Sequence, residues 1–484
     1  MRVTRRRLRM GSALLVTGAL ALSGCDSTGT EAAPSPSAAP TPSRTFTAGA
    51  PGAGDAYFPS YGNGGYDVAR YVVKVRYDPA KDQLTGTTTV QATATADLST
   101  FNLDLAGLTV TAVTVDGAPA THRRERNELV VKPASGLING NGFVAEVAYS
   151  GVPKPLKNDT LGDGGFLHTP DGAIALGQPE SASTWFPVND HPSDKAAYDF
   201  EITVPDGLTA VSNGVPGGKA STAGWTTWKW SEKSPMASYL STLVIGDFRI
   251  TTATHRGKPV YSAVAIAANG SADSSIAETT KVADYLETVF GPYPFDAYGG
   301  VVVADSRISY ALETQSRPVY AASFFAGGEN TEVVAHELAH QWFGDSVSLG
   351  KWEDIWLNEG FATYAEWLWA EHTKKSTAEE AFDSQYARSS AKVWKTPPGK
   401  PGAKELFSES VYQRGAMTLH ALRVSVGDKA FFEIVKTWAA EKHNGTATTA
   451  EFVALAERIS GRQLDAVFDD WLYGTRKPAL PKRL

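Results

Sequence analysis

The chain has 484 residues, of which 42% are hydrophobic and 20% are charged, a composition typical of soluble globular proteins and long enough for two or three domains with sizeable cores. The net charge is −7, and it becomes −12 without the five arginines among the first nine residues. Such an acidic chain argues against nucleic acid or an anionic bilayer as a binding partner.

The N-terminus has the pattern of an export signal. Its basic start is followed by an apolar stretch, residues 12–22, that is too short to span a bilayer. The stretch ends in Leu22-Ser23-Gly24-Cys25, which resembles a bacterial lipobox, where the cysteine carries a lipid and becomes the first residue after cleavage. Residues 1–25 are therefore predicted to be a lipoprotein signal peptide, with Cys25 as the lipid attachment site. The alternative is a plain secretory signal, with a faint twin-arginine pattern among its arginines.

Cys25 is the only cysteine, which excludes a disulfide framework and a thiolate metal site. If it is acylated, the protein is attached to the outer face of the bacterial cytoplasmic membrane through this lipid alone. Residues 26–54 are rich in Ala, Pro, Ser, Thr and Gly, too poor in apolar surface to offset the entropy of ordering. We expect them to form a disordered tether.

Residues 55–255 are predicted to form a domain of mostly antiparallel β-strands. Residues 71–77 alternate apolar and polar side chains, as a half-buried strand does, and residues 84–96 are rich in threonine. Residues 108–115 end at Asp116-Gly117, a typical hairpin turn. Short runs of the same kind continue to about residue 250.

Residues 256–484 are predicted to form a second, helix-rich domain. Residues 276–290 have helical spacing and are stopped by Gly291-Pro292, residues 300–304 indicate a buried strand, and long helical stretches follow between residues 331 and 471. The predicted fold class is therefore α+β, with an antiparallel β domain followed by an α-rich one.

The most specific motif lies in that second domain. His336-Glu337-Leu338-Ala339-His340 is an H-E-x-x-H, which on a helix puts both imidazoles on one face, where they can share a metal ion. Asn330 can cap this helix and Gly344 is placed to end it after Phe343. A pair of core or surface histidines is the alternative interpretation.

A third metal ligand is expected nineteen residues after His340, at Glu359. Two histidines and one carboxylate, with a fourth position open, are the ligand set of a zinc hydrolase. Glu337 is then the general base that takes a proton from the attacking water. Glu366, two helical turns beyond Glu359, can accept an N–H from a ligand imidazole, and Asp354 is a weaker candidate for such a role.

The H-E-x-x-H, the eighteen-residue gap and the run W-L-N-E-G-F-A resemble the gluzincin aminopeptidases of the aminopeptidase N and leukotriene hydrolase family. Residues 185–192 and 291–295 are also similar to family segments, and the resemblance extends over roughly residues 57–481. It implies a saddle-like β domain, a thermolysin-like catalytic domain with one Zn²⁺, and a zinc metallo-aminopeptidase acting on peptides with a free N-terminus.

The resemblance also implies roles for individual residues. Tyr412 matches the tyrosine that hydrogen-bonds the oxyanion, and Glu313, in Y-A-L-E-T, matches the carboxylate that binds the substrate's α-ammonium. Glu180 belongs to a second amine-binding segment and is expected beside Glu313. Tyr310 replaces a family glycine and is expected to reshape the subsite for the substrate's first side chain. The chain stops near the end of the catalytic domain, without the family's large C-terminal helical domain, so a more open cleft is expected.

Three alternatives remain at this point. An endopeptidase would use the same chemistry without an amine anchor, and an epoxide hydrolase would need a lipid tunnel to which no residue points. A non-catalytic surface-binding lipoprotein would not need to retain the ligands and the base. We expect a monomeric enzyme.

Overall fold

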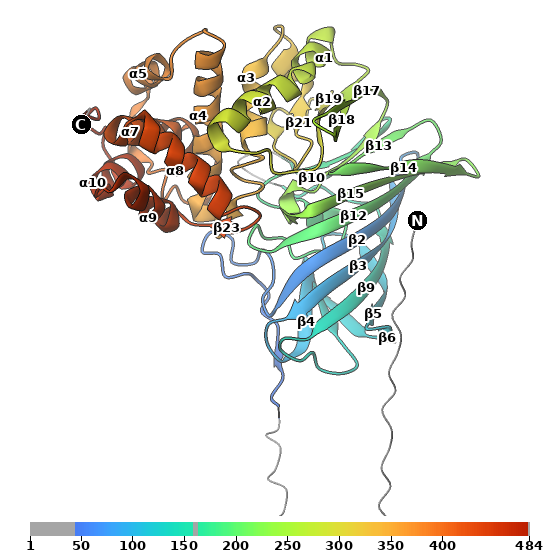
Figure 1. Ribbon diagram of the computed structural model, residues 1–484. Helices are drawn as coiled ribbons and strands as arrows, with labels where there is room; N and C mark the ends of the chain where they lie inside the picture. Colours follow the sequence, from blue (N-terminus) through green and yellow to red (C-terminus); the bar gives the residue numbers. More distant parts are fainter. Residues whose placement is uncertain (1–43, 158–162, 483–484) are drawn as a thin grey trace, which may run out of the picture. The chain divides into compact units, whose positions relative to one another are not determined.

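The computed structural model describes residues 44–157 and 163–482, and one compact unit spans Thr45–Leu484. The predicted signal peptide with Cys25 and most of the predicted tether lie outside the described residues. Strands, blue to green, occupy the first half of this unit, and helices, yellow-green to red, dominate the second (Figure 1). The predicted α+β class is confirmed.

An eight-stranded sheet is the largest part of the first half. Strand β2 shows why these residues form it, since Tyr71, Val73, Val75 and Tyr77 are all buried while the residues between them are not. The β2–β12 pair is parallel and the other pairs are antiparallel. In order across the sheet, the strands are β14 (Val215–Thr222), β15 (Trp225–Ala237), β12 (Lys195–Pro205), β2 (Tyr66–Asp78), β3 (Gln83–Ala94), β9 (Gly142–Gly151), β5 (Thr109–Val115) and β6 (Ala118–Pro119).

The predicted hairpin turn is present between β5 and β6. Asp116 and Gly117 have φ angles of 51° and 77°, the left-handed values that a tight two-residue hairpin requires, and Val115 pairs with Ala118. Asp116 also accepts a hydrogen bond from the amide of Val144, so the turn is tied to β9.

A four-stranded sheet packs next to this one and includes residues expected in the tether. Strand β1 pairs in parallel with β4, and the amide of Gly49 donates to the carbonyl of Thr100 at 2.8 Å. Regular structure is thus present before the predicted boundary at residue 55, because backbone pairing needs no apolar side chains. The strands, in order, are β1 (Thr47–Ala48), β4 (Leu98–Asp104), β8 (Glu128–Lys132) and β7 (Thr121–Glu125).

Two further sheets are present, and one of them spans the predicted domain boundary. The predicted boundary at residue 255 falls inside a hairpin, because β17 pairs with β18 in the sheet that also holds β19. One sheet has the order β10 (Gly165–Thr169), β11 (Gly172–Leu176), β16 (Leu243–Gly246), β13 (Thr209–Val211). The other has the order β17 (Phe248–His255), β18 (Lys258–Ala265), β19 (Tyr298–Val303), β21 (Val319–Ala321), β20 (Ala311–Leu312). A small pair, β22 (Ser348–Leu349) and β23 (Thr446–Ala447), lies among the helices.

The helices follow the sequence prediction closely. The predicted helix at residues 276–290 is split into α1 and α2, and Gly291, with φ at 99°, ends α2. Among the described residues, no helix is both long and apolar enough to cross a bilayer. The α-helices are α1 (Gly270–Ala277), α2 (Thr279–Phe290), α3 (Thr331–Ala339), α4 (Trp356–His372), α5 (Ala378–Arg388), α6 (Ala391–Lys395), α7 (Gly415–Val426), α8 (Asp428–Glu441), α9 (Thr449–Ser460) and α10 (Asp465–Phe468).

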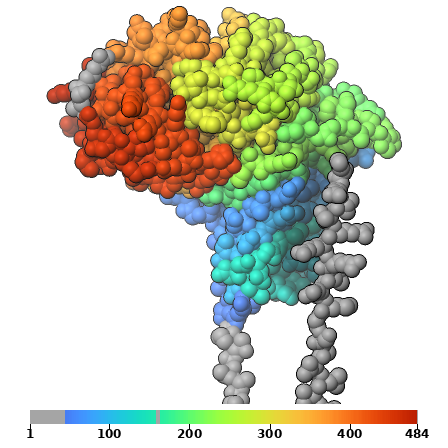
Figure 2. All heavy atoms as spheres, viewed as in Figure 1, coloured from blue at the N-terminus to red at the C-terminus, as the bar shows by residue number. Residues whose placement is uncertain are grey.

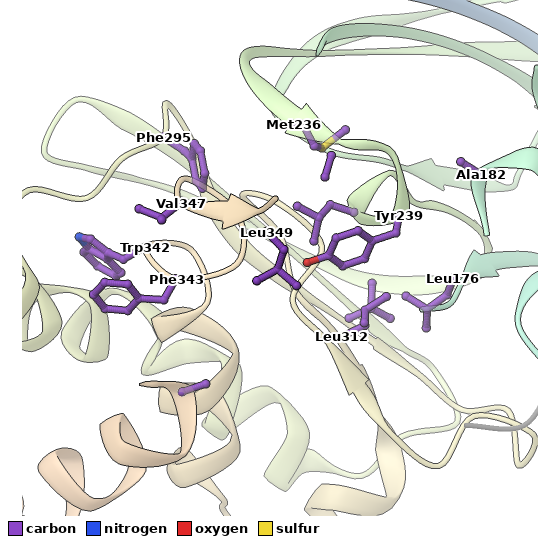
Figure 3. Packing of buried hydrophobic residues seen from close by; sticks show 14 of the residues in the cluster. Leu176, Ala182, Met236, Tyr239, Phe295, Leu312, Trp342, Phe343, Val347 and Leu349 are labelled. Carbon is purple, nitrogen blue, oxygen red and sulfur yellow. The ribbon is translucent and has the colours of Figure 1, made fainter. Parts of the chain in front are cut away.

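The two halves share one buried cluster of apolar side chains. Figure 3 shows Tyr239 and Leu176 from the first half near Leu312 and Leu349 from the second. In the space-filling view, the green surface of the strands continues directly into the yellow-green surface of the first helices (Figure 2). The functional site is built along this shared core.

Candidate active site

Helix α3 presents the H-E-x-x-H motif to the interior. The Asn330 side chain caps it, accepting hydrogen bonds from the amides of Glu332 and Val333, as predicted. The regular helix ends at Ala339, before Gly344, and His340 begins a wider turn in which the Asp345 amide donates to the His340 carbonyl. The prediction that the α-helix ends after Phe343 is therefore wrong. Three successive hydrogen bonds, each between residues five apart in the sequence, replace its last α-helical turn.

Helix α4 brings Glu359 against both histidines. The Oε2 atom of Glu359 lies 3.5 Å from Nε2 of His336 and 3.4 Å from Nε2 of His340. These three ligand atoms lie within 4.8 Å of one another, on residues that are almost fully removed from solvent. Burial alone would raise the pKa of Glu359, but the two imidazoles outweigh it and lower that pKa to about 2, so the group stays a carboxylate.

The far side of each imidazole is occupied by a hydrogen-bond acceptor. Nδ1 of His336 lies 2.6 Å from Oε1 of Glu366, and Nδ1 of His340 lies 3.1 Å from the carbonyl oxygen of Phe343. Both acceptors favour a proton on Nδ1, which leaves the Nε2 lone pairs facing Glu359. Two imidazole nitrogens and a carboxylate oxygen prepared in this way fit Zn²⁺. The predicted partnership of Glu366 with a ligand histidine is present in the structure.

Gly344 leaves room for one of these ligands. Its φ angle is 132°, and a Cβ atom there would lie 3.2 Å from Nδ1 of His340 and 3.3 Å from Nδ2 of Asn358. A larger residue would therefore press on the imidazole that the turn supports.

Glu337 lies close to both His340 and Glu313. Carboxylate oxygens of Glu337 and Glu313 and a ring nitrogen of His340 all lie within 4.8 Å of one another. Burial raises the pKa of Glu337 to about 8, against the opposing effect of His336 and His340. A dication held by the neighbouring ligands would lower this pKa and favour the basic form.

Glu313 is buried at the cavity wall and accepts hydrogen bonds from two side chains of the β-rich half. Its Oε1 atom accepts from the Tyr239 hydroxyl at 3.0 Å and from Nε2 of Gln178 at 3.3 Å. Its backbone carbonyl accepts from Nε2 of Gln341, one residue past His340, at 3.1 Å. This bond fixes the chain that carries Glu313 against the metal-binding helix.

Glu180, which was expected beside Glu313, is not among the residues that line the cavity holding Glu313. It hydrogen-bonds with Tyr61 instead and lies near Asp190, and burial raises the pKa of its carboxyl to about 8. Gln178, two residues earlier, lines the cavity in its place. The segment that resembles the family's second amine-binding segment therefore reaches the cavity through the neutral amide of Gln178.

Tyr412 lies against the ring of His336. Its ring stacks against that of His336 with centroids 6.0 Å apart, and its hydroxyl hydrogen-bonds with Glu359. Burial, and then the nearby carboxylates, raise the pKa of this phenol well above its ordinary value, so it remains a hydrogen-bond donor.

Arg414 was missed by the sequence interpretation. Tyr412 lies on a π-helical turn, Ser410–Arg414, and the fully buried Arg414 holds that turn in place by donating to backbone carbonyls. It bonds Trp471 at 2.8 Å, Trp394 at 2.9 Å and Gly474 at 2.6 Å. The only signal in the sequence was an arginine inside an apolar helical stretch.

Asp354 is not at the ligands, because its Oδ1 atom accepts from the Thr449 hydroxyl at 2.6 Å.

Lys195 ties the β-rich half to the turn after α3. Its ammonium group donates to the carbonyls of Asp345 at 2.7 Å and Ser346 at 2.8 Å, and to that of Gly445 at 3.4 Å. Burial lowers the pKa of Lys195 to about 7, a shift that Asp345 opposes. The position of His340 thus depends on a side chain from strand β12.

A single cavity of about 420 Å³ is lined by the predicted metal ligands and catalytic residues. It includes both histidines, Glu337, Glu359, Glu366, Glu313 and Tyr412, and it continues beyond them along α3. The remaining lining residues are Gln178, Ser309, Tyr310, Ala311, Leu312, Phe324, Asn330, Glu332 and Val333.

Comparisons with known proteins agree with this geometry. Residues 67–240 match the peptidase M1 N-terminal domain and residues 275–471 match the peptidase family M1 domain. A crystal structure of an M1 zinc metallopeptidase from Deinococcus radiodurans is 29% identical, with a TM-score of 0.82 over 90% of this chain and 99% of that one. A mutant of it bound to a Tyr-Ser-Ala substrate superposes with a TM-score of 0.83.

Curated relatives are also similar. Aminopeptidase N of Streptomyces lividans is 26% identical over 76% of this chain, and leucine aminopeptidase 2 of Sclerotinia sclerotiorum is 26% identical over 85% of it. The matches cover 46% and 73% of those two proteins, so the chain spans about half the length of the first relative.

Proposed function

Because this chain belongs to peptidase family M1, we propose that it is a zinc-dependent aminopeptidase, which removes N-terminal residues from peptides. The observation that carries the proposal is the place of Glu313. A buried carboxylate, within 4.8 Å of Glu337 and His340, can accept a peptide's free α-ammonium and so set the cut one residue from that end.

The residues divide the reaction among them. His336, His340 and Glu359 would hold Zn²⁺, which when bound supplies a Lewis acid that polarises the carbonyl and acidifies water. Glu337 takes the proton of the attacking water and passes it to the departing amine. Tyr412 donates a hydrogen bond to the carbonyl oxygen as negative charge develops there. Glu313, oriented by Tyr239 and Gln178, binds the ammonium.

The named relatives support this activity, since those quoted above are aminopeptidases or M1 zinc metallopeptidases. The structure of the Deinococcus protein with Tyr-Ser-Ala supports peptides as the substrate class. An endopeptidase would gain nothing from a buried carboxylate at one end of the cavity, so we favour the aminopeptidase.

The same proposal includes the protein's location. We propose a monomer attached to the outer face of the bacterial cytoplasmic membrane through a lipid on Cys25. The lipobox pattern and the basic start of the chain support this. Replacement of Cys25 by serine should move the protein from the membrane fraction to the soluble fraction, and an unchanged distribution would refute the lipid anchor.

The activity is tested with aminoacyl-anilides and with peptides that have free or acetylated N-termini, with and without a chelator. We expect cleavage only of substrates with a free amine, loss of cleavage with the chelator, and recovery with Zn²⁺. Glu337→Ala should bind zinc and lose nearly all turnover. Equal cleavage of acetylated and free peptides would instead support an endopeptidase, and no cleavage by zinc-loaded protein would refute both.

A further inference from the structure

Residues 55–61, which precede strand β2, contact both halves of the molecule. The hydroxyl of Tyr57 accepts a hydrogen bond from the amide of Gly402, in the helical half, at 3.0 Å. The hydroxyl of Tyr61 hydrogen-bonds with Glu180, in the β-rich half. The proposed mechanism has no role for this segment.

Asp55 is the anchor of the segment, and it is 5% exposed. Its Oδ1 atom accepts from the amides of Tyr57 at 2.7 Å and Phe58 at 3.1 Å. Its Oδ2 atom accepts from the amide of Trp352 at 2.8 Å and lies 3.4 Å from Nε2 of His191. Burial alone would raise the pKa of Asp55, but these hydrogen bonds outweigh burial and lower that pKa to about 2. The group that joins the segment to the helical half is therefore a carboxylate.

The bond to Trp352 replaces a missing helix cap. Trp352 is the first residue of a short 3₁₀ turn, Trp352–Asp354, and the residue before it, Lys351, makes no side-chain capping bond. The first N–H groups of a helical turn have no partner within the turn, so an acceptor must come from elsewhere. Asp55 supplies it, from 297 residues earlier in the chain. The indole N–H of Trp352 has no hydrogen-bond partner among the described residues, so this side chain is positioned by its packing and by the amide that Asp55 holds.

Trp352 connects this contact to the amine-binding carboxylate. Its ring is fully buried, with its centroid 6.2 Å from that of Phe58 and 5.5 Å from that of Tyr239. The Tyr239 hydroxyl donates to Oε1 of Glu313 at 3.0 Å. A continuous series of contacts thus joins Asp55 to Glu313.

We propose that Asp55 is a positioning residue for the amine-binding site. It holds Trp352 where that ring supports Tyr239. Tyr239 in turn keeps Glu313 oriented toward the substrate's α-ammonium, so the inference rests on the proposed function. An asparagine at residue 55 has a single acceptor oxygen and no charge, so it cannot keep all four of these contacts. The loss should fall on recognition of the amine, because the series of contacts does not pass through the general base.

The test measures how strongly the enzyme prefers a ligand with an amine. Inhibition constants are determined for leucinol and for 4-methylpentan-1-ol, the same compound without the amine. The wild type should bind leucinol more tightly by roughly tenfold to a hundredfold, as expected for hydrogen bonds between charged groups. Asp55→Asn should reduce this preference about tenfold, with unchanged zinc content. Asp67→Asn, on an exposed carboxylate of β2, is the matched control and should keep the wild-type preference.

A double-mutant cycle shows whether Asp55 acts through Tyr239. Tyr239→Phe alone should reduce the preference for leucinol, because it removes a donor to Glu313. The double variant should then lose little more than Tyr239→Phe does, since both changes act on one carboxylate. Fully additive losses would overturn the proposal, because they would mean that Asp55 acts by another route.

Further outcomes separate this role from folding and from metal binding. If Asp55→Asn does not fold, Phe58→Leu provides the same comparison, because it leaves Asp55 in place and removes the ring beside Trp352. Loss of zinc with an unchanged preference for leucinol would overturn the proposal and place the role of Asp55 at the metal ligands. If the wild type does not prefer leucinol, the proposed function fails with it. A wild-type preference that Asp55→Asn retains would overturn this inference alone.

Discussion

Gly360 and Gly415 face each other where helices α4 and α7 meet, and a Cβ atom added to Gly360 would lie 2.9 Å from the carbonyl carbon of Gly415. No other pair of residue types allows the two backbones to come this close. Glu359 immediately precedes Gly360, and Tyr412 lies three residues before Gly415. The contact therefore sets the distance between a metal ligand and the proposed oxyanion donor.

Replacement of Gly360 by alanine should separate these two helices. We expect a loss of about 1–3 kcal/mol in unfolding free energy from overpacking, together with a fall in kcat, because Tyr412 and Glu359 move apart. Urea denaturation and steady-state kinetics measure the two effects. Gly270→Ala, at a helix start where a Cβ meets nothing within 4 Å, is the control and should change neither. An unaltered kcat in Gly360→Ala would show that the helix spacing does not matter for catalysis.

Glu366→Gln should weaken zinc binding. The amide can no longer offer the charged acceptor that holds the Nδ1 proton of His336, and loss of such a partner typically costs tenfold to a hundredfold in metal affinity. Competition with a chromophoric chelator measures the affinity. Asp383→Asn, on the exposed face of α5, is the matched charge-neutralising control and should bind zinc like the wild type. Equal zinc affinity in both variants would show that Glu366 does not support metal binding.

Tyr412→Phe should lower kcat by about 10²–10³ while zinc content stays the same, because it removes a single donor to the developing oxyanion and leaves all three ligands. Tyr386→Phe is the control, since that hydroxyl donates to the Pro478 carbonyl away from the site. A rate within threefold of wild type would rule out Tyr412 as the oxyanion donor.

The metal site and its immediate support could be predicted from the sequence because they depend on helical periodicity. His336, His340 and Glu366 follow from spacings of four and seven residues on helices. The exchange of Gln178 for Glu180 could not be predicted, since it depends on how one turn orients alternate side chains. Nor could the contacts of Arg414 with three distant carbonyls, which exist only after α7 has packed against the C-terminal segment.

The stability of the protein should depend on pH through Glu232. This carboxyl is 3% exposed, and burial raises its pKa from 4.5 to about 7. Between about pH 4.5 and 7 the unfolded chain has lost this proton and the folded chain retains it, so unfolding releases a proton and stability falls as the pH rises, by up to about 3 kcal/mol.

Urea midpoints at pH 5 and pH 8 measure this effect. Glu232→Gln should show a smaller decrease between the two pH values than wild type, because the amide does not titrate. Glu201→Gln, on a half-exposed carboxylate of β12, is the control and should retain the wild-type decrease. The same decrease in all three proteins would assign the pH dependence to other groups.

The bond from Lys195 to the turn after α3 has a consequence for how this protein can be dissected. A metal-binding fragment made from the helical half alone would expose the Asp345 and Ser346 carbonyls that Lys195 now satisfies, and would lack the Tyr239 and Gln178 donors of Glu313. The helical half alone is therefore not expected to form an intact metal site in another protein. A substitution that moves Lys195, at the start of strand β12, should therefore also shift the turn that follows His340.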